Sequence, residues 1–509
     1  MFKKRSVAGL IAIAVAAALV APATSSVAAT KTKKVAKKKV TKKPVATTAA
    51  PAATAAPAVG AAGPCAAKPD TTQDKIYGDG AGQAQWAENC AEAKPLKAAG
   101  DPIVIGFQNP EGDPAGSFPE YRFGAEAAVG YINNELGGIG ADLAAGKPGR
   151  PIKLEVCSML INPTDSTKCA NELAAKKPFL VFSALNFFGN HFATYNAAKI
   201  PVLVGVPISP ADFTSPGTYA IGGGGGCLGV HTGLIEFATN DLGGLKVAVP
   251  WANTPPGVFC YHDLEKKPLN VLNGTTQAKD NTAALTKPKL THIGVPILPG
   301  QADVTPQAQQ VLDFKPDVIV FSAQNADCWT FVNALGKLGW TPAKIPLVLS
   351  GACVDDNAAR AAGDLAKGIY FIGSAPITQT ANLKGLLQEQ SKIYLAKSDK
   401  YGAKDQKLKG FATAGFLGMM NIWLQGNVAA KGNPASLNAQ TLEDAFAKTV
   451  RSHSWGSTPL ECTAAAAPYI TVCNPRVTAS QWNGVGYDVK RSDFSGLYLI
   501  KGTALDFGR

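Results

Sequence analysis

Residues 101–140 read DPIVIGFQNPEGDPAGSFPEYRFGAEAAVGYINNELGGIG. They begin with a short apolar run, Ile103–Phe107, which is typical of a buried strand, and continue through a polar loop into apolar residues at helical spacing. We expect this helix over Phe118–Leu136, with Ser117 and Glu120 as a capping box and two glycines as its stop. The stretch is therefore one strand–loop–helix unit of an α/β protein.

The same alternation recurs along the chain. Further strands are expected at 152–157, 179–183, 202–205, 245–249, 317–321, 346–349 and 369–372. Helices are expected at 164–177, 229–240, 307–314, 330–338, 357–366, 381–397, 410–426 and 442–450. Nearly continuous apolar strands alternating with helices predict parallel sheets covered on both faces. Because eight or more such strands strain a single sheet, we expect an α/β protein with two doubly wound lobes joined by a hinge.

The amino terminus has the pattern of an exported protein. Lys3-Lys4-Arg5 precede the apolar run Val7–Val20 and then small residues, which predicts a Sec-type signal peptide over residues 1–29, cleaved on export. A transmembrane anchor is the alternative, but it needs about 20 apolar residues. The protein is therefore expected outside the cytoplasm, in the periplasm, in the cell wall or secreted.

Residues 30–64 are rich in Lys and then in Ala and Pro, which predicts a disordered linker. Two interpretations of its eight lysines stay open: attachment to an anionic cell wall or membrane surface, and a solubilising spacer. The whole chain of 509 residues has a net charge of +12, but residues 1–64 hold eleven basic and no acidic residues, which leaves about +1 for residues 65–509. A net charge this close to zero over residues 65–509 argues against a nucleic-acid partner.

Ten cysteines in an exported chain favour disulfides. Sequence alone does not fix their pairing, since eight cysteines already allow 105 connectivities. We expect nearest neighbours to pair, which gives five short-range loops. No C-x-x-C occurs and no histidine lies near a compact cysteine pattern, so no metal site and no cofactor are predicted. The cysteines are residues 65, 90, 157, 169, 227, 260, 328, 353, 462 and 473.

No catalytic signature is found. Residues 224–229 match G-x-G-x-x-G, but the next strand ends without the acid that a dinucleotide ribose needs, and we interpret Gly222–Gly226 as a hinge crossover. The pair Asp355-Asp356 has two functional interpretations, a catalytic dyad or metal ligands, but adjacent acids in a loop are mostly solvated or cap a helix. The sequence therefore predicts a binding protein rather than an enzyme.

Four segments carry a family resemblance: residues 103–140, GRPIKLEVC at 149–157, NPTDSTKCANELAAKKPFLVFSALN at 162–186 and KIPVLVGVPIS at 199–209. They resemble the first lobe of type I periplasmic binding proteins, in particular the leucine/isoleucine/valine-binding-like solute receptors of ABC transporters. The resemblance implies a first lobe from 101–221 and 375–460, a second lobe from 222–374 and 461–509, and an N-terminal extension over 65–100.

The resemblance also implies ligand contacts in loops after the strands. On the first lobe these are Gln108, Asn109, Asn186, Phe187 and Ser209, and on the second lobe Trp251, Asn253, Gln324 and Asn325. Two departures matter: the loops SGACVDD and PWANTPP lack the glutamate and tyrosine with which amino-acid receptors of this group bind the ligand. An α-amino acid ligand is therefore in doubt, since a buried ammonium without a carboxylate is costly.

The expected function is capture of a small polar or amphipathic molecule, amino-acid-like, amide or related, for the permease of an ABC importer. Two other classes stay open. A cell-wall-associated sensor or adhesion protein would use the Lys-rich segment for attachment, and a secreted hydrolase would need a nucleophile or acid pair that the sequence does not display.

Overall fold

The computed structural model describes residues 64–222, 224–273 and 290–500. The expected signal peptide and the linker, apart from Pro64, lie outside the described residues. The chain divides into two units after Val59, and every described residue belongs to the second unit, Gly60–Arg509. Within the described ranges, no helix combines the length and apolarity that crossing a bilayer requires.

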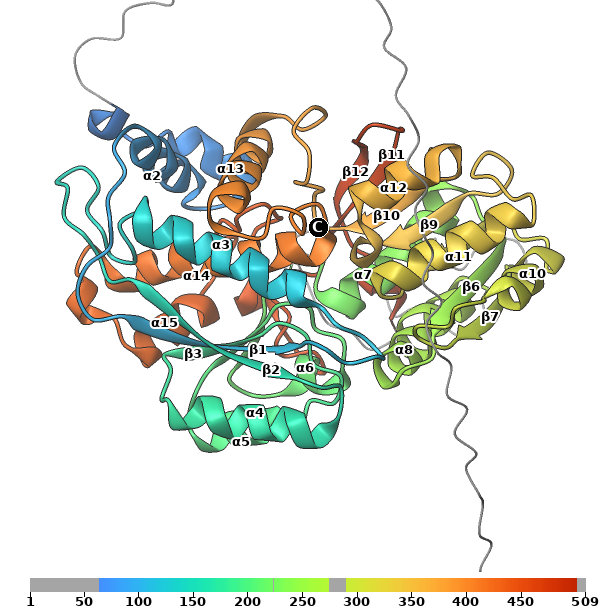
Figure 1. The fold of residues 1–509 in the computed structure, drawn as a ribbon, viewed down its shortest axis with the longest axis horizontal. Coiled ribbons are helices and arrows are strands. Elements are labelled where there is room, and N and C mark those ends of the chain that lie inside the picture. Colours follow the sequence, from blue (N-terminus) through green and yellow to red (C-terminus); the bar gives the residue numbers. More distant parts are fainter. Residues whose placement is uncertain (1–63, 223, 274–289, 501–509) are drawn as a thin grey trace, which may run out of the picture. The chain divides into compact units, whose positions relative to one another are not determined.

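The first sheet has five parallel strands in the order β2-β1-β3-β4-β5 (Figure 1). They are β1 Ile103–Pro110, β2 Ile152–Met159, β3 Leu180–Ser183, β4 Val202–Val204 and β5 Thr218–Ala220. Successive side chains of β3 belong to different cores: Phe182 packs under α3 (Pro119–Asn134) and α14 (Gly410–Ala430), and Val181 packs under α4 (Pro163–Ala175) and α5 (His191–Ala197). Both faces are buried, which explains the continuously apolar strands.

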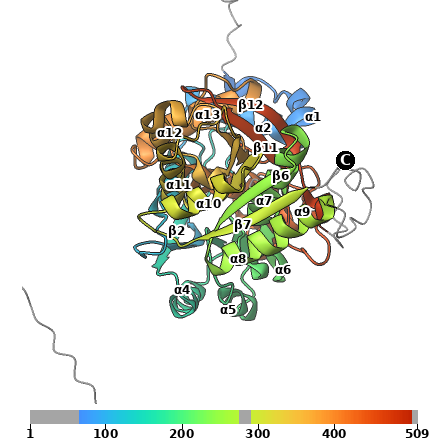
Figure 2. The same cartoon turned by 90° about the vertical axis from the view of Figure 1, so that its right-hand side faces the viewer.

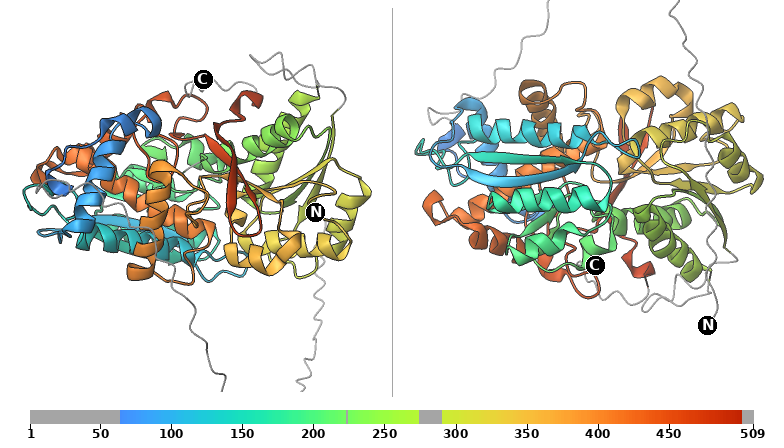
Figure 3. Two further views of the ribbon diagram at one scale, coloured as in Figure 1. Left: turned by 90° about the horizontal axis from the view of Figure 1, so that it is seen from above. Right: turned by 60° about the horizontal axis from the view of Figure 1, so that its bottom comes forward.

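The second sheet has seven strands in the order β12-β11-β10-β9-β8-β6-β7. They are β6 Lys246–Ala252, β7 Thr291–Ile297, β8 Val318–Phe321, β9 Leu347–Ser350, β10 Tyr370–Gly373, β11 Val477–Trp482 and β12 Tyr487–Phe494. Helices α10 (Thr305–Asp313) and α11 (Asn325–Lys337) cover one face of this sheet, and α7 (Gly226–Glu236) and α9 (Lys267–Leu272) cover the other (Figure 2). Ile319 belongs to the core under the first pair of helices and Val318 to the core under the second. The hairpin of β11 and β12 runs antiparallel along the edge beside β10 (Figure 3).

The chain passes between the two sheets three times. The first crossover includes residues 221, 222, 224 and 225, between β5 and α7; the second is 374–384, between β10 and α13 (Gly385–Tyr401); the third is 474–476, before β11. Between the second and third crossovers, α13, α14 and α15 (Ala439–Ala447) return to pack on the first sheet. We call each sheet with its helices a lobe; three crossovers joining two lobes form a hinge-like connection.

The N-terminal extension packs on the first lobe. It contains α1 (Asp74–Tyr77) and α2 (Ala81–Ala93), and the Cys65–Cys90 disulfide closes it. Glu88 of α2 is 3% exposed and accepts a hydrogen bond from the indole nitrogen of Trp455. Asp79 exchanges backbone hydrogen bonds with Arg451 and His453, so the extension is continuous with the fold of the lobe.

The structure confirms the doubly wound α/β class, the eight expected strands and the nearest-neighbour pairing of all ten cysteines. Strands β5, β7, β11 and β12 are not among the eight; in β7, Pro296 and the glycine at 294 obscure the apolar pattern. The capping box at Ser117 is wrong. Its hydroxyl accepts from the amide of Gly112 at 2.8 Å, so it stays in the loop, and Phe118 occupies the N-cap position of α3.

Candidate ligand-binding site

A cavity of about 220 Å³ lies between the two lobes. Loops at the carboxyl ends of the strands form it, from Gly205 and Val206 after β4 of the first lobe to Ser322 and Ala323 after β8 of the second. The first two crossovers contribute Gly222 and residues 374–378. This edge of parallel sheets is where ligands of α/β proteins bind, because helix N-termini and free loop groups gather there.

Aromatic rings line the first-lobe side of the cavity. Phe118 and Phe187 stack with ring centroids 6.4 Å apart, and Phe411 meets Phe118 edge-on at 5.3 Å. Phe411 begins α14, next to the lining residues Gly410 and Ala414. These rings give the cavity an apolar wall that suits a flat or branched hydrocarbon body.

Two titratable side chains line the cavity among its described residues, Asp327 and His231, and both come from the second lobe. Asp327 lies in the first turn of α11 and its Oδ1 accepts from the amide of Gly300 at 3.0 Å. Burial raises the pKa of this carboxyl. The cavity therefore offers a ligand few charges and a predominantly apolar surface.

His231 lies near two cysteines. Its ring, Cys227 and Cys260 place their potential ligand atoms within 4.8 Å of one another, so the expectation that no histidine lies near a cysteine cluster is wrong. The sequence cue was present, because His231 follows Cys227 by one helical turn. Both sulfurs form one disulfide in this structure, which leaves no thiolate for a metal ion.

Of the nine residues expected to contact a ligand, Phe187 and Gln324 line the cavity. The other seven do not line it. Gly351 and Ala352, from the loop that lacks the glutamate, do line it. For all nine residues, direct ligand contact stays a prediction.

The four other first-lobe residues are buried and hold the loops in place. Gln108 Oε1 accepts from Tyr195 at 2.8 Å, and Asn186 Nδ2 donates to Ser166 Oγ at 2.9 Å. Asn109 Nδ2 donates to the Phe118 carbonyl at 2.8 Å, directly behind the aromatic wall. Gln108 and Asn109 are 0% exposed and Asn186 is 1% exposed, so these hydrogen bonds are made in the interior of the lobe.

Ser209 has a separate local role, because its side chain caps α6 (Pro210–Thr214) in a capping box with Asp212. It is 2% exposed. A buried hydroxyl at the start of a helix satisfies backbone N–H groups that would otherwise lack partners. Ser209 therefore shapes the loop after β4.

The three remaining second-lobe residues hold local structure. Trp251 stacks on Tyr261 with ring centroids 5.1 Å apart, and the backbone N–H of Asn253 donates to the Ile297 carbonyl at 2.7 Å. Asn325 Nδ2 donates to the Val354 carbonyl at 3.1 Å and so joins two loops at the cavity edge. Neighbours of these residues, such as Ala252 and Gln324, reach the cavity instead.

A second cavity, of about 760 Å³, lies between the N-terminal extension and helices α14 and α15. Its walls include Trp86 of α2 and Trp423 of α14. All of its lining residues come from the extension and the first lobe, so closure of one lobe on the other would not enclose it. We therefore take the cavity between the lobes as the candidate site.

A model of the family described as periplasmic binding protein matches residues 270–455. No curated protein matches the sequence. Solved structures supply the other similarities, all of them at low sequence identity and high coverage.

A leucine binding protein from Thermotoga maritima is 12% identical, with a TM-score of 0.56 over 77% of this chain and 98% of that chain. An ABC transporter solute-binding protein from R. palustris, in complex with 4-hydroxybenzoate, is 18% identical, with a TM-score of 0.58 over 78% and 97%. A branched-chain amino acid transporter substrate-binding protein from Streptococcus pneumoniae, in complex with isoleucine, is 17% identical, with a TM-score of 0.53 over 76% and 99%.

The fold is therefore that of the type I periplasmic binding proteins, the two-lobed solute receptors of ABC transporters, and the family resemblance is confirmed. More than a fifth of the chain is left uncovered by each of these matches.

Proposed function

We propose that this protein captures a small amphipathic molecule between its lobes and delivers it, unchanged, to the permease of an ABC importer. One observation carries the proposal: residues of both lobes and of two crossovers line a single cavity at the carboxyl ends of the strands. A ligand that contacts both lobes favours the closed arrangement of such a receptor by its differential affinity.

The lining favours a ligand with an apolar or aromatic body and few polar groups. Phe118, Phe187 and Phe411 offer ring surfaces, while Gln324 offers hydrogen bonds. The neutral loops at 350–354 and 252–257 support an acid, an amide or an alcohol over an α-amino acid. The 4-hydroxybenzoate bound by the protein from R. palustris is of the right class and is a rational first probe.

We further propose the lobe boundaries 101–221 with 375–460 and 222–374 with 461–509, export through the signal peptide at 1–29, and an extracytoplasmic location. The Lys-rich segment would then hold the receptor near an anionic wall or membrane surface. Deletion of residues 30–44 tests this role, since it should reduce retention on cell-wall preparations at low salt without changing ligand affinity.

A thermal-shift screen of the mature protein tests the proposal. The panel contains aromatic acids, their amides, branched-chain amino acids and short peptides. We expect a saturable rise in melting temperature with aromatic acids or amides, and no consumption of the ligand. Turnover of an ester, glycoside or peptide would instead establish an enzyme and contradict the proposal.

A further inference from the structure

The cavity between the lobes has one basic side chain among its described lining residues, His231. It lies on α7, directly after the first crossover, and its side chain is 12% exposed. Nδ1 of His231 lies 2.8 Å from Oε1 of Glu265, whose side chain is 1% exposed. A carboxylate in this position fixes the Nδ1–H bond and the ring orientation, so Nε2 is the ring nitrogen left for a molecule in the cavity.

A disulfide fastens the segments that carry this pair. Cys227 lies one turn before His231 in α7, and Cys260 lies at the end of α8 (Pro255–Tyr261). Glu265 follows in the helical turn 262–266 that extends α8. The covalent link and the hydrogen bond therefore hold the imidazole at the cavity wall before a ligand arrives, which lowers the ordering cost of binding.

The other residues that line the cavity indicate which chemical group of a ligand this imidazole would bind. A ligand carboxylate that enters a largely apolar cavity loses its hydration and needs a charged donor there. Neither lysine nor arginine occurs among the described lining residues, and Asp327 repels an anion. The protonated imidazole donates from both nitrogens, Nδ1 to Glu265 and Nε2 to the ligand.

We propose that His231, positioned by Glu265 and the Cys227–Cys260 disulfide, binds the carboxylate of the ligand, so that the receptor selects aromatic or branched apolar monocarboxylates over their amides. This inference rests on the proposed function and names its ligand class. The aromatic side chains of the first lobe contact the apolar part of the ligand, and His231 of the second lobe binds its carboxylate. Binding both ends would draw the lobes together.

Titration calorimetry with 4-hydroxybenzoate and 4-hydroxybenzamide tests the inference, because the two probes share shape and differ in charge. The wild-type protein should bind the acid more tightly. In His231→Gln the affinity for the acid should fall about tenfold or more and that for the amide by less than about threefold. His262→Gln is the matched control, since this exposed imidazole meets the ring of Trp251 edge-on and does not line the cavity.

Two further variants separate charge recognition from packing. Asp327 shares the cavity with His231 but does not hold the imidazole, so Asp327→Asn should keep the preference for the acid over the amide. Glu265→Gln should weaken acid binding more than amide binding.

Equal losses for acid and amide in His231→Gln, or a wild-type preference for the amide, would overturn the inference while leaving the proposed receptor function intact. Failure of both probes to bind would overturn the proposed ligand class. In that case the wider thermal-shift panel decides the receptor function separately.

Discussion

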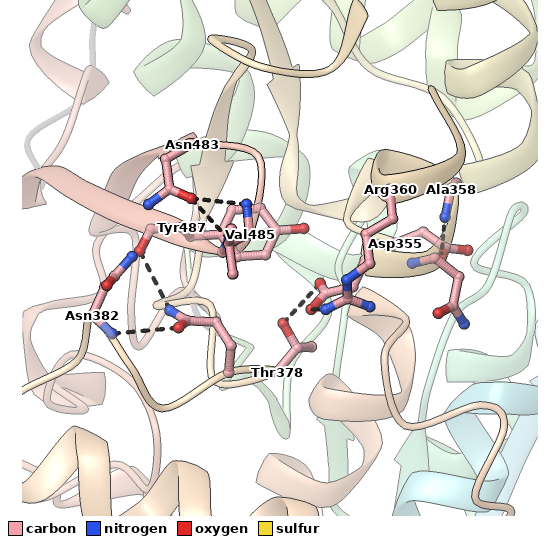
Figure 4. Close-up of polar contacts among 12 residues, drawn as sticks. Asp355, Ala358, Arg360, Thr378, Asn382, Asn483, Val485 and Tyr487 are labelled. Atoms are coloured by element: carbon pink, nitrogen blue, oxygen red, sulfur yellow. Dashed lines mark hydrogen bonds and ion pairs between the residues drawn. The ribbon is translucent and has the colours of Figure 1, made fainter. Parts of the chain in front are cut away.

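Thr378 Oγ1 donates a hydrogen bond to Asp356 Oδ1 at 3.1 Å and so ties the second crossover to the first turn of α12 (Asp356–Ala362) (Figure 4). Asp356 is 0% exposed, and Arg360 approaches its other oxygen at 3.4 Å. A second bond, from Asn382 to Asp488 at 2.8 Å, fixes the same crossover to β12. The crossover is also tied to the first lobe, because Ser391 Oγ of α13 donates to the carbonyls of Ile377 and Gln379, each at 2.9 Å.

Replacing Thr378 by Val tests this anchor. The variant keeps the shape of the side chain but leaves a buried carboxyl oxygen without its donor, which costs about 1 to 3 kcal/mol. Chemical denaturation should show that loss in the free energy of unfolding. Thr380→Val, a few residues along the same crossover, is the matched control and should change stability by less than about 0.5 kcal/mol. Equal effects of the two changes would refute the anchor.

Gly222 in the first crossover has no room for a side chain. A Cβ at this position would lie 1.7 Å from the carbonyl oxygen of Gly205, and both residues line the cavity. Gly222→Ala should therefore displace the crossover, lower the free energy of unfolding by about 2 to 3 kcal/mol and weaken ligand binding.

Gly243→Ala is the control for this prediction. Its φ of 70° also disfavours alanine, but no atom lies within 4 Å of the added carbon, so a loss of about 1 kcal/mol is expected. Denaturant titration of both variants gives the comparison. A smaller loss for Gly222→Ala than for Gly243→Ala would contradict the close approach.

Filling the cavity should abolish binding without unfolding the protein. Ala414 of α14 lines the cavity and is half-buried, so Ala414→Trp places an indole where the ligand body would lie. We expect at least a hundredfold loss of affinity with a near-native melting temperature. Val428→Trp, on an exposed position of the same helix outside the cavity, should bind as the wild type does.

Glu88 should make stability depend on pH. Burial raises its pKa from 4.5 to about 8, so the folded protein keeps a proton that the unfolded chain has lost above about pH 4.5. The free energy of unfolding therefore falls as pH rises from about 4.5 to 8, by on the order of 2 to 5 kcal/mol from this group. Glu88→Gln removes that dependence and keeps an acceptor for Trp455.

Denaturation of both proteins at several pH values measures this effect, since other groups cancel in the difference between them. The variant should gain stability relative to the wild type with increasing pH. A constant difference across the range would show that Glu88 is not buried in its neutral form.

The strands were predictable because both faces of both sheets are buried: Val181 and Phe182 enter different cores, yet both must be apolar. The site was predictable only in part. Phe187 and Gln324 follow strand ends and reach the cavity, whereas Asn186 and Asn325, their neighbours, turn to backbone and side-chain partners. Whether a loop residue or its neighbour reaches the cavity depends on the geometry of the loop, which the hydrophobic periodicity of the sequence does not encode.

Two cavity residues reach the site through connections between segments that are distant in sequence. Phe411 follows no strand, and it reaches the cavity because the chain returns to the first lobe after the second crossover. His231 follows Cys227 by one helical turn, but the disulfide that fastens this turn joins Cys227 to Cys260, which is distant in sequence. Long-range connections of this kind become visible only in the folded chain.

Calorimetry of the mature protein with 4-hydroxybenzoate, followed by chemical recovery of the ligand, tests the central claim most directly. We predict one molecule bound per chain, recovered unchanged, with binding lost in Ala414→Trp and retained in Val428→Trp. Conversion of the ligand to a product, or undiminished binding by Ala414→Trp, would contradict capture between the lobes.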